Sequence, residues 1–278
     1  MVSTKPIRGT RMLKIMKLSD IDRMLLFLKA RSGSPRGLNG AYLWEVATAN
    51  MMRVFYTESA DFDNIFYAYY VKKGVVIEDW YTNGSSYIES ILNLINLHPT
   101  GDIFFGFQDK RIGHTFARKL HDEIGEMKCL IANNEYLDSC PLFNPNHRKD
   151  VVNLLSQKWW TKDQSQDFVD VTSSNPSGLS KVVLDNTNCA IGFSHTMFVG
   201  DSAWINCVYV DEDCRGKGYA RRLVESTIAR LKEIGVANVF LGVDKSNRNA
   251  IKLYKTLGFE FTEFRKWQFQ IDRALLKR

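Results

Sequence analysis

The chain has 278 residues, of which 45% are hydrophobic and 24% charged, a balance typical of a globular protein of one large or two small domains. Lys and Arg number 37 and Asp and Glu 31, so the net charge of +6 suits an anionic ligand but is too small to indicate nucleic-acid binding. No apolar run approaches the roughly 20 residues that a bilayer-spanning helix needs, so no membrane partner is expected.

The first 19 residues carry five basic side chains and no acidic one. Two interpretations stay open: a solvated arm before the first helix, or a targeting sequence, which would be consistent with a mitochondrial location. Ser19 precedes an apolar-periodic stretch, which predicts a capped helix ending near Gly33. The five cysteines are odd in number and form no Cys-x-x-Cys pair, and the five histidines are scattered. These features indicate reduced thiols in a cytoplasmic protein without a zinc site.

Aromatic and β-branched runs alternate with amphipathic stretches up to residue 131. A turn at Lys72-Lys73-Gly74 joins two of these runs, and His98-Pro99 ends a helix. The pattern predicts strands at residues 51–56, 64–71, 75–81, 102–107 and 127–131, and helices from Ser85 or Ser86 to Leu97 and at residues 112–124.

Residues 138–146 contain two of the six prolines and form a candidate linker, which divides the chain into domains at residues 1–138 and 139–278. Beyond it, residues 172–178 are predicted to be a loop. The pattern predicts helices at residues 147–159, 218–234 and 247–257, strands at 181–184, 189–198, 203–210 and 238–243, and a hairpin at 259–271.

Both halves therefore share one order of helix, strands, helix, strand, helix, strand. This order predicts an α/β (α+β) fold made of two related domains, although the two sequences barely match. An unrelated first domain stays open, because that half has only Thr-Asn-Gly where the second half has a glycine-rich turn.

That turn, Arg215-Gly216-Lys217-Gly218-Tyr219-Ala220, lies between an apolar strand and an amphipathic helix. Several backbone N–H groups can point into one concavity there, and the helix N-terminus adds positive charge. Two glycines without Cβ atoms let phosphate oxygens approach the main chain. The turn therefore predicts a diphosphate site, whereas a tight turn without function is the simpler alternative.

The segment resembles the GNAT acetyltransferase superfamily, whose signature fits Arg215, Gly218 and Ala220 without a gap. A second stretch similar to the family, residues 247–259, follows at the expected distance, and the resemblance covers about residues 147–271. It implies a mixed, mostly antiparallel sheet that is splayed and flanked by helices. It also implies acetyl-coenzyme A or another acyl-coenzyme A as cosubstrate, and no metal.

The resemblance assigns roles to single residues. It implies that the backbone at Val208 and Val210 pairs with the pantetheine arm and that the N–H groups from Arg215 to Ala220 bind the pyrophosphate. Asn249 would hydrogen-bond the cofactor, and the strand at residues 238–243 would splay from its neighbour to admit the thioester.

The resemblance also makes Tyr254 the proton donor to the departing thiolate, although a packing role stays open. Several relatives use a Glu eleven residues before the signature Arg as general base, and this chain has Trp204 there. His195, on the preceding strand, is the candidate base because its ordinary pKa is about 6.5; a purely packing histidine is the alternative.

The predicted reaction is acyl transfer, most simply acetyl transfer, to the primary amine of a small molecule or amino acid. Protein N-termini or lysines as acceptors, and a non-catalytic acyl-coenzyme A sensor, stay open as alternatives, as does a homodimer. The aromatic residues suit either a flat hydrophobic acceptor or the surface on which the first domain packs. They are Trp159, Trp160, Trp204, Phe264, Trp267 and Phe269.

Overall fold

The computed structural model describes residues 13–20, 23–24, 48–49, 51–58, 62–82, 87–131, 135–158 and 160–277. Most of the basic N-terminal arm and of the predicted helix from Ser19 to Gly33 lies outside the described residues. Among the helices described, none is both long and apolar enough to cross a bilayer.

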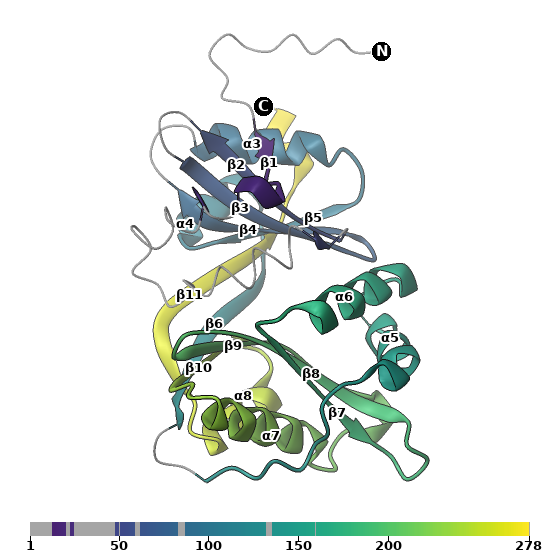
Figure 1. The fold of residues 1–278 in the computed structure, drawn as a ribbon. Coiled ribbons are helices and arrows are strands. Elements are labelled where there is room, and N and C mark those ends of the chain that lie inside the picture. The colour runs from purple at the N-terminus through teal and green to yellow at the C-terminus, as the bar shows by residue number, and fades with distance from the viewer. Residues whose placement is uncertain are drawn as a thin grey trace.

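The described strands form one eleven-stranded sheet that runs through both halves of the molecule (Figure 1). The fold is a mixed α/β fold with a large, mostly antiparallel sheet flanked by helices. Among the described strands, the neighbours β4/β5 and β9/β10 are parallel and all other pairs are antiparallel. In spatial order the strands are β1 (Lys14–Ile15), β2 (Met52–Glu58), β3 (Phe62–Val71), β4 (Gly74–Thr82), β5 (Asp102–Phe107), β11 (Glu260–Gln270), β6 (Leu120–Leu130), β10 (Asn238–Asp244), β9 (Ser202–Val210), β8 (Ala190–Val199) and β7 (Gly178–Leu184).

From their three antiparallel strands onward, the two halves follow the order of elements that the sequence predicted, while the predicted first helix of the N-terminal half lies outside the described residues. Three antiparallel strands (β2–β4) are followed by α3 (Tyr87–Leu97), the parallel strand β5, α4 (Lys110–Phe116) and the long strand β6. In the same way β7–β9 are followed by α7 (Tyr219–Glu233), the parallel strand β10, α8 (Arg248–Thr256) and the long strand β11. Two further helices, α5 (Arg148–Ser156) and α6 (Lys162–Ser174), precede β7.

The last long strand of each half, β6 or β11, pairs with strands of the other half. Strand β6 lies between β11 and β10, so the C-terminal half is completed by a strand from the N-terminal half. Strand β11 continues past β6 to pair with β5, and Trp267 lies opposite Phe107 there. Because both halves build one continuous sheet, the boundary between residues 138 and 139 remains a prediction.

Two predicted elements were wrong. Residues 112–124 were expected to be one helix, because Ile112, Phe116, Leu120 and Ile124 recur every four residues. The helix ends at Phe116 and β6 begins at Leu120, since partner strands on both edges of β6 override that local pattern. Residues 259–271 form one strand rather than a hairpin for the same reason. Helix α6 was not predicted, and it occupies part of the expected loop at residues 172–178.

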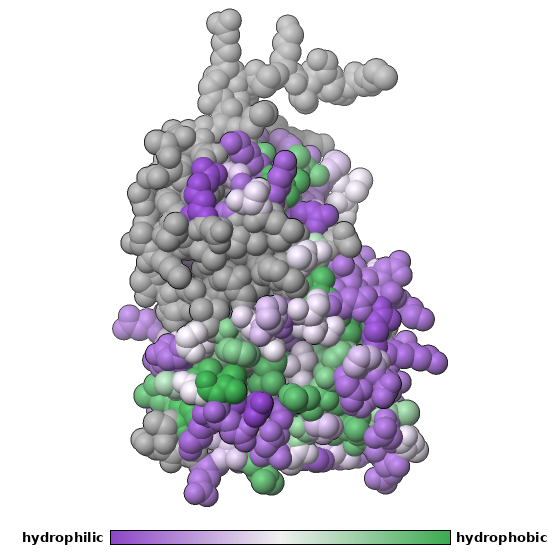
Figure 2. Space-filling model, viewed as in Figure 1, coloured by the Kyte–Doolittle hydropathy of each residue, from purple (hydrophilic) through white to green (hydrophobic). Residues whose placement is uncertain are grey.

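One of the buried apolar clusters joins the two halves. Met52 and Tyr67 of the N-terminal sheet belong to the same buried cluster as Leu155 of α5, Phe168 of α6 and Phe193 of β8. Figure 2 shows hydrophilic residues over the outer side of the region where α5 and α6 lie, and hydrophobic residues gathered over the centre of the C-terminal half. The inner faces of α5 and α6 therefore pack between the N-terminal and C-terminal parts of the sheet, and their outer faces meet water.

Candidate active site

The glycine-rich turn at the start of α7 has free space beside both of its glycines. Strand β9 ends at Val210, a short 3-10 helix follows, and Gly218 is the N-cap of α7. Gly216 and Gly218 have φ angles of 78° and 83°, a region that favours glycine, and a Cβ added to either would meet no atom within 4 Å. Space for a ligand therefore lies against the main chain.

The main-chain amides at this turn are available to a ligand. Within the described part of the chain, the N–H groups from Gly216 to Ala220 make no hydrogen bond to the protein. Consecutive N–H groups at a helix N-terminus bind anions because the helix dipole places positive charge there. The turn thus fits a diphosphate by its backbone and by the space beside it.

Cationic side chains surround the turn and are held by local partners. Arg215 donates from Nε to the Val210 carbonyl at 3.2 Å, and its guanidinium lies 3.1 Å from the Glu212 carboxylate. The ammonium of Lys217 lies 3.4 Å from the carbonyl of Asp213. These exposed contacts are weak, so both cations can reorient toward an anion.

Strands β9 and β10 separate next to the turn. They pair only from Ser202–Ile205 to Asn238–Leu241. Residues 207–210 remain paired with β8, Asn206 is the extra residue at a register shift between the two strands, and none of the described strands pairs with the other edge of residues 206–210. An exposed strand edge can pair with an extended ligand backbone such as an amide-bearing arm. The separation of the strand at residues 238–243 from its neighbour is confirmed.

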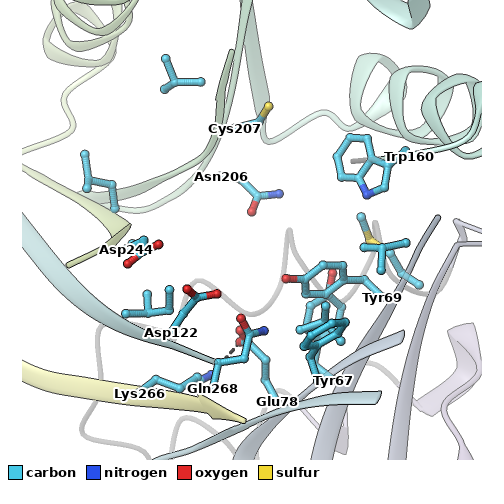
Figure 3. A pocket seen from close by; sticks show the side chains of 18 of the residues that line it. Tyr67, Tyr69, Glu78, Asp122, Trp160, Asn206, Cys207, Asp244, Lys266 and Gln268 are labelled. Atoms are coloured by element: carbon cyan, nitrogen blue, oxygen red, sulfur yellow. Dashed lines mark hydrogen bonds and ion pairs between the residues drawn. The ribbon is translucent and has the colours of Figure 1, made fainter. Parts of the chain in front are cut away.

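The gap opens into a cavity of about 730 Å³ between the two halves (Figure 3). Carboxylates of Asp122 and Asp244 lie on one side, and the rings of Tyr67, Tyr69 and Trp160 lie on the other. Asn206 projects into the space from the separated part of β9. The cavity therefore has a polar end and an aromatic end. Residues of both halves line the cavity. Its lining from the N-terminal half includes Met52, Tyr67, Tyr69, Lys72, Glu78, Phe104, His121 and Asp122. Its lining from the C-terminal half includes Trp160, Phe168, Met197, Trp204, Asn206, Cys207, Val208, Asp244, Tyr254, Lys266 and Gln268.

Tyr254 reaches this cavity from α8, where its ring packs 5.8 Å from that of Phe259. Burial, with a smaller contribution from the nearby Cys207, raises the pKa of Tyr254 to about 12. The phenol therefore keeps its proton throughout the neutral range and can donate a hydrogen bond to a developing anion.

The polar end is built around a buried ion pair. Lys266 of β11 has a side chain only 2% exposed, and its Nζ lies 2.6 Å from the Glu78 carboxylate of β4. Burial, and then the charges of Glu78 and Asp122, raise the pKa of Tyr69. Both carboxylates therefore lie close enough to act electrostatically on a phenol at the aromatic end.

The predicted site residues are only partly brought together. Val208 and Tyr254 line the cavity, whereas Val210 is buried in a cluster with Leu223. Asn249 lies exposed on the first turn of α8, and Asn247 is the residue that caps this helix, by accepting from the Ala250 N–H at 3.1 Å.

His195 lies apart from the cavity in the described structure. Its side chain is fully buried, its Nδ1 is 2.8 Å from Ser180 Oγ, and its ring meets Phe168 edge-on. Among the predicted aromatic residues, Trp160 and Trp204 line the cavity, while Phe269 is part of the core of the N-terminal half. Glu78, Asp122 and Lys266 were not anticipated, because no local pattern links residues that lie so far apart in the chain.

Among the described residues, no group of three or more His, Cys, Asp or Glu side chains is arranged to hold a metal ion. The five cysteines are free thiols.

Comparison with known proteins agrees with this geometry. The acetyltransferase (GNAT) family matches residues 141–259. A 74-residue stretch is 39% identical to the [ribosomal protein bS18]-alanine N-acetyltransferase of Escherichia coli and covers 27% of this chain and 50% of that enzyme. A mycothiol acetyltransferase of Propionibacterium freudenreichii is 26% identical over 115 residues, 40% of this chain and 32% of that protein. The chain thus aligns with half or less of the length of these relatives.

Two solved structures resemble the whole chain. A GCN5-related N-acetyltransferase from Sphaerobacter thermophilus has a TM-score of 0.58 at 14% identity, covering 95% of this chain and 96% of that one. A tandem GNAT protein from the clavulanic acid biosynthesis pathway has a TM-score of 0.62 at 11% identity, covering 93% and 98%. These identities show a shared fold. The family match and the sequence relatives place the C-terminal half of the chain in the GNAT superfamily of acetyltransferases.

Proposed function

We propose that this chain transfers an acetyl group from acetyl-coenzyme A to the primary amine of a small molecule. The observation that carries the proposal is the gap between β9 and β10, which lies beside the cavity that Tyr254 lines, while the same strand β9 leads on to the amide-rich turn at Gly216–Gly218. A thioester anchored by its diphosphate at the turn would reach the cavity along the open edge of residues 206–210. The cosubstrate supplies an electrophilic carbonyl carbon there.

Each residue of this path has a defined task in the proposal. Amides from Gly216 to Ala220 bind the diphosphate, with Arg215 beside them, and the edge of β9 near Val208 aligns the arm. Tyr254 donates a hydrogen bond to the departing sulfur. Because its pKa is about 12 and that of an ordinary thiol is about 8.5, full proton transfer from Tyr254 is uphill. Its contribution is therefore stabilisation of the thiolate.

The shape of the cavity favours a small acceptor. The N-terminal sheet covers the side opposite β9, so the acceptor lies between residues of both halves. An amine near Asp122 and a flat or apolar body against Tyr67, Tyr69 and Trp160 would match its two ends. We further infer that the N-terminal half is a related domain without a diphosphate turn, which forms one wall of the acceptor cavity.

Two measurements test this proposal. Thermal shift and calorimetry with acetyl-coenzyme A measure binding, because a ligand of the folded state raises Tm. Release of free thiol with a panel of small primary amines measures transfer. Binding together with amine-dependent thiol release is the expected result. Binding without release for any small amine or N-terminal peptide would instead favour a sensor of acyl-coenzyme A.

A further inference from the structure

A β-bulge places two consecutive polar residues on the cavity side of β6. Asp122 pairs with Gln268, but Leu120 pairs with Phe269, so His121 is an extra residue opposite β11. In a regular strand, neighbouring side chains point to opposite faces of the sheet. Here His121 and Asp122 both line the cavity, and the His121 Nδ1 lies 2.5 Å from the Asp122 Oδ2. A bulge that redirects a side chain is a recurrent feature beside active sites.

The hydrogen bond fixes the form of the imidazole. A carboxylate can only accept, so Nδ1 of His121 carries the proton and Nε2 keeps its lone pair in the neutral ring. The ring also meets Phe104, another cavity residue, edge-on at 4.8 Å. His121 is therefore held from two sides, with one basic nitrogen left for a substrate.

The other cavity carboxylates are committed to structural contacts. Glu78 holds the buried ammonium of Lys266 at 2.6 Å. Asp244 accepts hydrogen bonds from the N–H and the hydroxyl of Ser246, at 2.8 and 2.9 Å. Asp122 by contrast orients a histidine, and His121 is 44% exposed, so solvent can remove a proton from the imidazole after each turnover.

The position in the sheet also fits. Ile124 pairs with Asp244, the last residue of β10, so His121 and Asp122 lie just beyond the end of β10 that diverges from β9. This is the end of the cavity next to the proposed thioester.

From this geometry we propose that His121 is the general base of the transfer and Asp122 its positioning residue. The inference rests on the proposed function. Nε2 of His121 takes a proton from the acceptor ammonium, and the freed lone pair attacks the thioester carbonyl carbon. A C–N bond forms, the C–S bond breaks, and the thiolate leaves hydrogen-bonded to Tyr254. The nitrogen loses a second proton, which protonates the thiolate, and the imidazolium returns its proton to water. The general base thus comes from the N-terminal half, on the strand that this half gives to the other.

Titratable and charged groups from several elements line the cavity around the pair. They are Asp122 on the same strand, Tyr69 on β3, Glu78 on β4, Asp244 on β10 and Lys266 on β11.

The test compares His121→Gln with His114→Gln, a histidine on α4 that is exposed and packs against Phe269 outside the cavity. Thiol release is measured from pH 6 to 10 with one active amine, and acetyl-coenzyme A affinity and Tm are measured alongside. His121→Gln is expected to lower kcat at pH 7 by about 10²- to 10⁴-fold, with acetyl-coenzyme A affinity within threefold of the parent. The deficit should shrink once the pH exceeds the acceptor's own pKa, because water then supplies the neutral amine.

Asp122→Asn is the second variant and covers the case in which His121→Gln folds poorly. It is expected to lower kcat by about tenfold and to move the acidic limb of the pH profile, while His114→Gln matches the parent. If the parent is active and both cavity variants keep kcat within threefold with an unchanged pH profile, the assignment of His121 is overturned and the proposed function stands. A parent that turns over no amine overturns both.

Discussion

Placing a carboxylate on the turn tests the diphosphate site directly. Gly218→Asp puts a negative charge at the N-cap of α7, where a Cβ would meet no atom within 4 Å. At about 5 Å from one phosphate charge, and with an effective dielectric constant of about 20, the repulsion is about 3 kcal/mol. That corresponds to about a hundredfold weaker Kd for acetyl-coenzyme A at low salt, and to less at higher salt.

Gly235→Asp is the matched control. Gly235 follows the other end of α7, with φ of 86° and the same open space, about 25 Å from Gly218 along the axis of the 15-residue helix. Both variants place a side chain in the left-handed region, at about 1 kcal/mol each. A carboxylate is favourable at a helix N-terminus and unfavourable at its C-terminus, by about 0.5 kcal/mol. Gly235→Asp should therefore lower Tm more, by a few degrees, and leave binding unchanged.

Calorimetry and thermal melts of the two variants separate the effects on binding and stability. Weaker binding for Gly218→Asp together with lower stability for Gly235→Asp is the expected crossed result. Equal affinity of the two variants for acetyl-coenzyme A, within threefold, would refute the placement of the diphosphate at this turn.

Three other outcomes can be measured. Tyr254→Phe should lower kcat by about 10²-fold with little change in Kd; since the pKa of Tyr254 is about 12, the pH profile between 6 and 10 should keep its shape. Burial raises the pKa of Cys207 to about 12, so a thiol reagent at pH 8 should modify the exposed Cys189 within minutes and Cys207 far more slowly, as peptide mapping would show. Glu78→Gln removes the carboxylate of the buried Lys266 and should lower the free energy of unfolding by about 3 kcal/mol in urea titrations, whereas retention of full stability would contradict the ion-pair argument.

Local signals were sufficient for most of the C-terminal half. The strands predicted at residues 189–198 and 203–210 match β8 and β9, and the glycines at 218 and 235 marked both ends of α7. Gly216 and Gly218 were assigned to a turn that needs residues without Cβ, and both have positive φ. These elements are specified by neighbours in sequence, so sequence patterns predicted them.

Sequence patterns did not predict the elements that depend on pairing between strands far apart in the chain. Residues 120–124 follow a four-residue period, yet they are extended because β10 and β11 hydrogen-bond to both edges of β6. His121 and Asp122 gained a common face through a bulge opposite Gln268, which depends on the register with β11. No local sequence pattern indicates the extended conformation of residues 120–124 or the bulge at His121, because the partner strands lie more than 100 residues away in the chain.

Strand exchange gives a physical reason for the association of the two halves. Without β6, strands β10 and β11 would each present an unpaired edge, a feature that promotes aggregation. Removing β11 would expose β5 in the same way and would take Lys266 away from Glu78. The hydrogen bonds that close the sheet are thus the ones that bring Asp122 and Lys266 to the cavity. The C-terminal half therefore depends on the N-terminal half both to complete its sheet and to line the cavity.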